Sequence, residues 1–230
     1  MNAADRTFAP SDKNIKIFDS ATSISDNIDN LIANKDKIKT IDSSDDKPIS
    51  LTAQQLNALK GKFGADETLK VSALTAGEKL DMSDGKYIYS FDLNVQHAKT
   101  TWRIENFGAD DKLDFSGVFT DTKIGLEEFD LKKQMYNPRA LMDNKIYGAT
   151  LSYVPAGRGG SKDGEIKAFK DAFITKISKN AKELLIVKNT KDKYIYAIEN
   201  DDNIQIEQSE IKLLGVVSSD IDITPDNIIL

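Results

Sequence analysis

Three aspartates lie within five positions in the middle of the chain, at Asp110, Asp111 and Asp114. Carboxylates this close repel one another unless water solvates them or a hard cation neutralises them. Carboxylate oxygens are the ligands that Ca²⁺ prefers in proteins. Two interpretations follow from the residues alone: a solvated acidic turn, or a calcium site formed by Asp110, Asp111 and Asp114.

His97 is the chain's single histidine. One histidine cannot build a histidine-based zinc site, and a Ser-His-Asp triad would have to use this residue. A haem site would pair His97 with a tyrosine such as Tyr87 or Tyr89. The other interpretation is an exposed histidine at the end of a strand.

Other catalytic patterns are missing from the sequence. Cysteine is absent, which excludes disulfides, zinc-thiolate sites and thiol catalysis. No G-x-S-x-G nucleophile elbow occurs, and the glycine-rich residues 157–160 lack the lysine-serine ending of a phosphate-binding loop. Carboxylates are too common here for their spacing to identify a glycosidase pair. We therefore expect a binding or structural protein and no enzyme.

The composition is that of a soluble folded protein. The 230 residues are 40% hydrophobic and 30% charged, with a net charge of −6. Nucleic acid and anionic membranes are poor partners, because both need a basic surface. The first 12 residues lack the apolar core of a Sec signal, and the longest aliphatic run, residues 184–187, is far too short to cross a bilayer. We expect a cytoplasmic chain, a fragment, or export by a route that ignores the N-terminus.

The acidic stretch is flanked by strand patterns. Trp102, Ile104 and Phe107 precede it and Leu113 and Phe115 follow it, which predicts a strand, a tight turn and a second strand. Upstream, short strands are predicted at residues 37–42, 48–51, 69–74 and 86–95. Two short helices are also expected, one starting near Ser23, before the first of these strands, and one at Thr52, whose Gln55 completes a capping box.

A weak internal repeat runs through the same region. Ile-Lys-x-x-Asp at Ile15 recurs at Ile38, and Leu-Thr-Ala at Leu51 recurs at Leu74, both at an offset of 23. Repeats of this length indicate stacked supersecondary units, although two short matches can also arise by chance.

The second half changes character. Residues 126–131 and 168–177 have helical spacing, residues 145–155 are rich in strand formers, and residues 156–164 are expected to form a loop. Three further strands are predicted at residues 184–188, 194–199 and 203–214, joined by hairpin-like turns.

The central stretch resembles the segment that closes the β-roll of proteins exported by bacterial type I systems, which include RTX proteins, serralysin-type proteases, adhesins and surface-layer proteins. The matching residues are Asn106, Phe107, Asp111, Leu113, Asp114, Phe115 and Ser116. Residues 87–91 resemble the strand that precedes this segment. The tail resembles the family's C-terminal ending at Leu213, Gly215, Val216, Asp226, Ile229 and Leu230. The family's calcium-binding nonapeptide does not occur in the chain.

Together, these observations predict a mixed, β-rich fold. We expect parallel strands of a β-solenoid or roll with short interspersed helices in residues 1–118, and C-terminal antiparallel strands in residues 119–230. The resemblance implies a secreted or cell-surface bacterial protein of the surface-layer or adhesin type, with a C-terminal signal read by a type I exporter. It further implies attachment to a surface polysaccharide or self-assembly. The alternative is a small secreted enzyme or haem-binding protein that uses His97.

Overall fold

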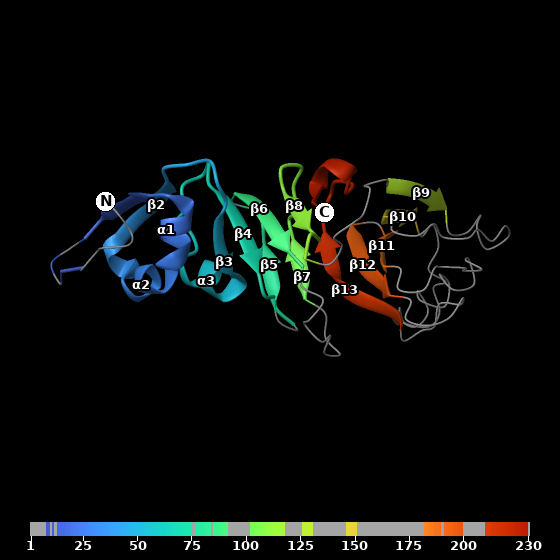
Figure 1. Ribbon diagram of the computed structural model, residues 1–230, viewed down its shortest axis with the longest axis horizontal. Coiled ribbons are helices and arrows are strands. Elements are labelled where there is room, and N and C mark those ends of the chain that lie inside the picture. The colour runs from blue at the N-terminus through green and yellow to red at the C-terminus, as the bar shows by residue number, and fades with distance from the viewer. Residues whose placement is uncertain are drawn as a thin grey trace.

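The computed structural model describes residues 8, 9, 11, 13–74, 77–83, 85–91, 102–117, 126–130, 146–150, 182–189, 191–199 and 210–229. The elements are β1 (Ile15–Asp19), α1 (Ala21–Asp26), α2 (Ile28–Ala33), η1 (Lys35–Lys37), β2 (Ile38–Ser43), β3 (Ile49–Thr52), α3 (Ala53–Ala58), β4 (Thr68–Ser72), β5 (Lys79–Asp81), β6 (Lys86–Ser90), β7 (Arg103–Glu105), β8 (Lys112–Asp114), β9 (Leu126–Asp130), β10 (Ile146–Thr150), β11 (Lys182–Asn189), β12 (Asp192–Glu199), β13 (Ile211–Ser218), η3 (Pro225–Asn227) and β14 (Ile228–Ile229). Figure 1 shows an elongated molecule in which the C-terminal strand β13 lies in the middle, beside β7, and β12 to β9 lie beyond it.

The strands form three sheets that are mostly parallel. One sheet has the order β14-β8-β6-β4-β3 and is parallel throughout. A second has the order β5-β7-β13-β12-β11-β10-β9, and its two antiparallel pairs are β11–β12 and β12–β13. The third is the parallel pair β1–β2. The predictions of a β-rich fold, of parallel strands before residue 118 and of antiparallel strands near the C-terminus are confirmed.

Apolar side chains at equivalent positions of successive strands form continuous ladders. In the five-stranded sheet, Leu51 pairs with Val71, Val71 with Tyr89, Tyr89 with Leu113, and Leu113 with Ile228. In the seven-stranded sheet, Leu80 pairs with Ile104, and Ile104 with Val217. All of these side chains are buried. We use the word rung for one turn of the chain, from a strand of one sheet through a strand of the other sheet and back. Stacking each rung on the next removes its apolar side chains from water.

The short helices begin where the sequence supplies a cap. Thr52 and Gln55 form the capping box predicted for α3. The expected start near Ser23 lies three residues too late: the Ser20 side chain accepts a hydrogen bond from the Ser23 backbone N–H and begins α1. In place of one helix after this start there are two, because α1 ends at Asp26 and α2 begins at Ile28 after Asn27.

One of the two sequence matches of the internal repeat corresponds to a structural repeat. Ile15 pairs with Ile38, although a bulge then shifts the register so that Ile17 pairs with Ile41. The second match is not a structural repeat, because Leu51 pairs with Val71 at an offset of 20 and Leu74 lies beyond the end of β4.

The C-terminal segment returns to the rung that contains the three aspartates. β13 pairs in parallel with β7, and β14 pairs in parallel with β8. The backbone N–H of Phe115 donates to the Ile229 carbonyl at 2.8 Å. Residues 210–229 therefore form the next rung in space after residues 102–115. The two rungs are direct neighbours in the sheets but are far apart in the sequence. The sheets thus cross the expected boundary at residue 118.

Two predicted elements differ from the structure. Residues 126–131 were expected to be helical, but Leu126–Asp130 is strand β9, because parallel pairing with β10 outweighs the weak helical preference of Glu127 and Glu128. The expected strand-turn-strand at residues 101–117 is present, but β7 and β8 belong to different sheets and do not pair with each other. His97, residues 156–164 and residues 168–177 lie outside the described residues.

Candidate functional site

Asp111 lies at the end of the turn that carries the chain from β7 to β8, and its side chain is buried. One carboxylate oxygen accepts a hydrogen bond from the Gly108 backbone N–H at 2.7 Å, and the other accepts from the Tyr87 backbone N–H at 2.9 Å. The first bond closes the turn, and the second joins it to the preceding rung. Burial raises the pKa of Asp111 to about 6, with a further contribution from the neighbouring charge of Asp110.

Asp114 is also buried and joins three strands of the five-stranded sheet. Its carboxylate accepts from Lys70 Nζ on β4 at 2.7 Å, from Ser90 Oγ on β6 at 3.1 Å, and from Ser116 Oγ at 2.6 Å. Burial opposes ionisation of this carboxyl, but the hydrogen bonds from Lys70 and Ser116 outweigh it, so the pKa of Asp114 is lowered. Asp114 therefore remains charged beside a lysine at neutral pH.

The three aspartates thus have different surroundings. Asp110 is exposed, whereas the Asp111 and Asp114 carboxylates accept hydrogen bonds from different groups of donors. Within the described ranges, no group of three or more Asp, Glu or His side chains has the arrangement of a metal site. Calcium at Asp110, Asp111 and Asp114 stays a prediction. The observed contacts give Asp111 and Asp114 a role in joining rungs.

Hydrogen bonds like that of Asp111 recur along the molecule. Many side chains bond to a group one rung away, at sequence separations of 24 to 26 residues. These pairs are Ala21–Asp45, Ser43–Glu67, Tyr87–Asp111, Ser90–Asp114, Ser25–Ser50, Asp81–Asn106, Asp29–Gln55 and Lys79–Glu105. This network was not predicted from the sequence. The offset of 23 in the first repeat was its signal, because it is close to the length of one rung.

A cluster of aromatic rings fills the core beside the aspartates. Phe91 stacks on Phe115 with ring centroids 4.1 Å apart, and Tyr89 and Trp102 lie within 5.3 Å of Phe91. Trp102 also covers Gly215 of β13: a Cβ atom at position 215 would lie 2.3 Å from the indole ring. Tyr87 and Tyr89, the tyrosines considered for a haem site, are both buried.

The returning C-terminal segment is fixed to this rung by polar contacts. Arg103 donates to both carboxylate oxygens of Asp192, at 2.7 and 3.3 Å, and to Ser218 Oγ at 2.7 Å. The Asn227 side chain donates to the carbonyls of Ala109 and Asp111, each at 3.0 Å. Because Asn227 is buried, these two bonds hold η3 against the turn that contains Asp111.

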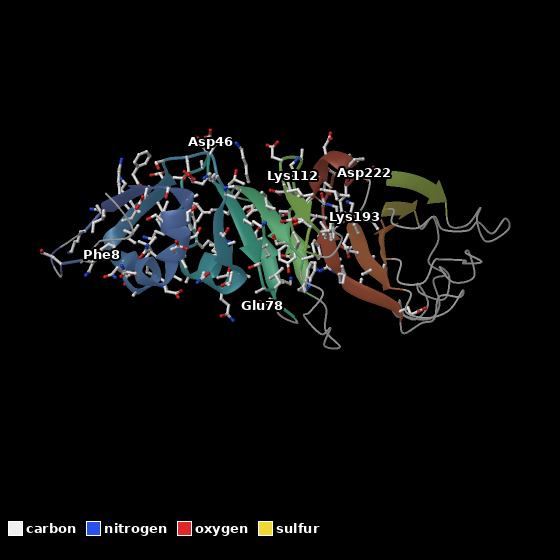
Figure 2. All side chains as sticks on the ribbon, in the orientation of Figure 1. Phe8, Asp46, Glu78, Lys112, Lys193 and Asp222 are labelled. Carbon is white, nitrogen blue, oxygen red and sulfur yellow. The ribbon has the colours of Figure 1, made fainter. Side chains whose placement is uncertain are left out.

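Lys193 adds to these polar contacts of the C-terminal segment. Its side chain is only 2% exposed, and its Nζ donates to the Ser219 carbonyl at 2.5 Å. The Ser219 hydroxyl in turn donates to the Phe107 carbonyl at 2.6 Å. Figure 2 labels Lys193, on β12, close to the C-terminal segment in this view.

A small pocket lies between α3 and the following rungs. Its volume is about 60 Å³, and its polar lining includes Lys60, Glu67 and Asp81. Burial raises the pKa of Glu67, whereas a hydrogen bond from Asn106 lowers that of Asp81 to about 2. A pocket of this size and polarity has room for a few water molecules.

Comparison with known proteins gives no relative: no family model, curated protein or solved structure matches the chain. In the part of the chain that the structure describes, no helix combines the length and apolar character needed to cross a membrane.

Proposed function

We propose that this chain is an extracellular structural or attachment domain of a type I-exported bacterial surface protein, of the surface-layer or adhesin type. Its strands form a β-solenoid in which the polar bonds between rungs keep a long, narrow molecule rigid. The single observation that carries the structural role is the recurrence of side-chain bonds at separations of 24 to 26 residues. Such a network distributes polar residues along the stack. An enzyme, in contrast, brings its polar residues together at one active site.

The C-terminal segment combines features of an export signal with features of a folded rung. The exposed acids Asp220, Asp222 and Asp226 alternate with the buried Ile223 and Ile228. An exporter would read this segment while the chain is unfolded. Afterwards β13 and β14 add to the two sheets, and Asn227 fastens the segment.

The experiment is to fuse the whole chain behind a passenger protein in its host, with and without the type I exporter. We expect the passenger in the medium only when the exporter is present. The variant Asp222→Lys/Asp226→Lys should reduce export at least about tenfold, whereas Asp36→Lys/Asp46→Lys, with the same charge change on distant exposed residues, should not. Retention of the passenger under both conditions would refute export by this route.

The alternative use of His97 has a direct spectroscopic test. Haemin added to the purified protein should give no Soret band that depends on His97. A band present in the wild type and lost in His97→Ala would favour haem binding over the structural role.

A further inference from the structure

Residues 219–229, which we call the strap, leave the end of β13 and cross to β14 at the edge of the five-stranded sheet. Their regular structure is limited to the short η3 and the two residues of β14. In the strap, only Ser219, Ile223, Asn227 and Ile228 are buried. A segment with so few buried apolar side chains opens at a lower free energy than the strands around it.

The strap is fastened to the rest of the molecule at its two ends. At the first end, the Ser219 hydroxyl donates to the Phe107 carbonyl at 2.6 Å, and the Ser219 carbonyl accepts from Lys193 Nζ at 2.5 Å. At the far end, the Phe115 backbone N–H donates to the Ile229 carbonyl at 2.8 Å. Most of the strap between these ends is exposed.

Asn227 is the residue that both orders the strap and ties it down. Its side-chain oxygen accepts hydrogen bonds from the Thr224 backbone N–H at 3.0 Å and from the Thr224 hydroxyl at 2.9 Å. Its side-chain nitrogen donates to two carbonyls of the turn between β7 and β8. Lys112 adds a bond from outside the strap, since its Nζ donates to the Asp226 carbonyl.

The elements on both sides of the strap are held by bonds that do not involve it. β13 pairs with β12 from its first residue to its last, Ser218. The turn between β7 and β8 is closed by the Asp111 carboxylate, which accepts from the backbone N–H groups of Gly108 and Tyr87. The chain can therefore open from Ser219 onward while β13 and this turn keep their places.

The closed strap covers apolar side chains of the five-stranded sheet. Ile228 of β14 pairs with Leu113 of β8, and both Leu113 and Phe115 are 0% exposed. Opening the strap exposes part of this surface to water, which costs free energy. The closed state is therefore the major one, and the open state is a minor population.

We propose that the strap opens and closes while the two sheets stay folded, and that closure withholds the proposed export signal from the exporter. Asp220, Asp222 and Asp226 all belong to the strap, so one movement changes the availability of all three. An exporter that takes an extended chain cannot take this segment while both of its ends are fastened. The withholding role rests on the proposed function, whereas the opening is a property of the purified protein.

Native-state hydrogen exchange of the purified full-length protein tests the opening. The Phe115 backbone N–H donates to Ile229 in the strap, and the Phe91 backbone N–H donates to Asp114 in the same way one rung earlier, at 2.9 Å. We expect Phe115 to exchange at least about tenfold faster than Phe91. Low concentrations of urea should accelerate exchange at Phe91 but hardly at Phe115, because opening the strap exposes little surface. Equal rates and equal urea dependence at the two sites would overturn the proposal.

Two lysine variants test the withholding role without changing the strap itself. Lys112→Ala removes a bond to the strap and should speed exchange at Phe115 about threefold. Export of a passenger fused ahead of the chain should rise by up to the same factor in the host. Lys86→Ala makes the same charge change on β6, which β8 separates from β14, and should alter neither quantity.

Circular dichroism melting identifies a variant that fails to fold. Asn227→Asp is then the replacement, since it loses the two donated bonds and should speed exchange at Phe115 at least about tenfold. Equal export of the two lysine variants would overturn the withholding role. No export of any variant, with fast exchange at Phe115 in the purified protein, would refute the proposed function and the withholding role with it, and would show that the failure lies in export and not in the opening of the strap.

Discussion

At the scale of single residues, Asp111 is the clearest case of a carboxylate that forms hydrogen bonds within the fold. Its two oxygens bond to two backbone N–H groups, and its burial raises its pKa to about 6. A carboxyl whose pKa is raised in the folded state contributes stability that is fully present below its unfolded pKa and lost as the pH rises through the folded value.

We therefore expect Asp111 to make the folded protein more stable at pH 5 than at pH 7, by about 1 kcal/mol. Urea unfolding of the wild type and of Asp111→Asn at both pH values isolates this contribution, since other groups titrate in both proteins. The variant should lack the Asp111 part of the pH dependence. An identical pH dependence in the two proteins would show that the pKa of Asp111 is not raised.

Gly215 gives a second residue-scale prediction, because Trp102 occupies the space that a methyl group would need. Gly215→Ala should lower the free energy of unfolding by about 1–3 kcal/mol through overpacking. Gly108→Ala is the matched control, since a Cβ there would meet Asp111 at an ordinary 3.6 Å. Equal stability of the two variants would show that Trp102 can move aside.

At the scale of elements, the turn between β7 and β8 is held from both sides. Asp111 joins it to β6, and Asn227 joins it to the C-terminal rung. Asn227→Ala removes the hydrogen bonds to the carbonyls of Ala109 and Asp111, of which the second is buried, and should destabilise the protein by about 1–3 kcal/mol. Hydrogen exchange of η3 and β14 should accelerate in this variant and remain unchanged in Asp226→Ala, whose side chain is exposed. Unchanged exchange in both variants would contradict the fastening role of Asn227.

The same turn carries the calcium prediction. Calcium at Asp110, Asp111 and Asp114 should raise the melting temperature through binding to the folded state, and Asp111→Asn/Asp114→Asn should abolish the increase. Melting is measured with calcium and with a chelator. Equal melting temperatures would leave Asp111 and Asp114 with their hydrogen-bonding roles alone.

How far the sequence predicts these elements depends on whether the signal is local. The capping box at Thr52 and the strands that became β2, β3 and β6 depend on neighbouring residues, and they were predicted correctly. β9 was mistaken for a helix because pairing with β10 is a distant effect that its own residues do not encode. The separation of β7 and β8 into different sheets and the return of β13 and β14 are likewise set by long-range pairing. For the candidate site, the sequence identified the aspartates but not their donors, since Tyr87 and Lys70 are one and two rungs away.

At the scale of the whole molecule, the apolar ladders and the bonds between rungs describe a stack that extends in one direction. Each rung buries its apolar residues against the next, so the stability of the stack depends on contacts between neighbouring rungs. The same kind of strand pairing is repeated along the length of the molecule, which fits the proposed structural role.

Locating the protein in its host is the strongest test of the proposal that this chain is an extracellular structural or attachment domain. Intact cells are treated with a protease, and the full-length chain is quantified at the surface, in the medium and in the cytoplasm, with and without the type I exporter. We predict a surface-exposed or released protein that accumulates inside cells when the exporter is removed. A chain that stays in the cytoplasm and is protected from protease in both strains would refute the proposed extracellular location.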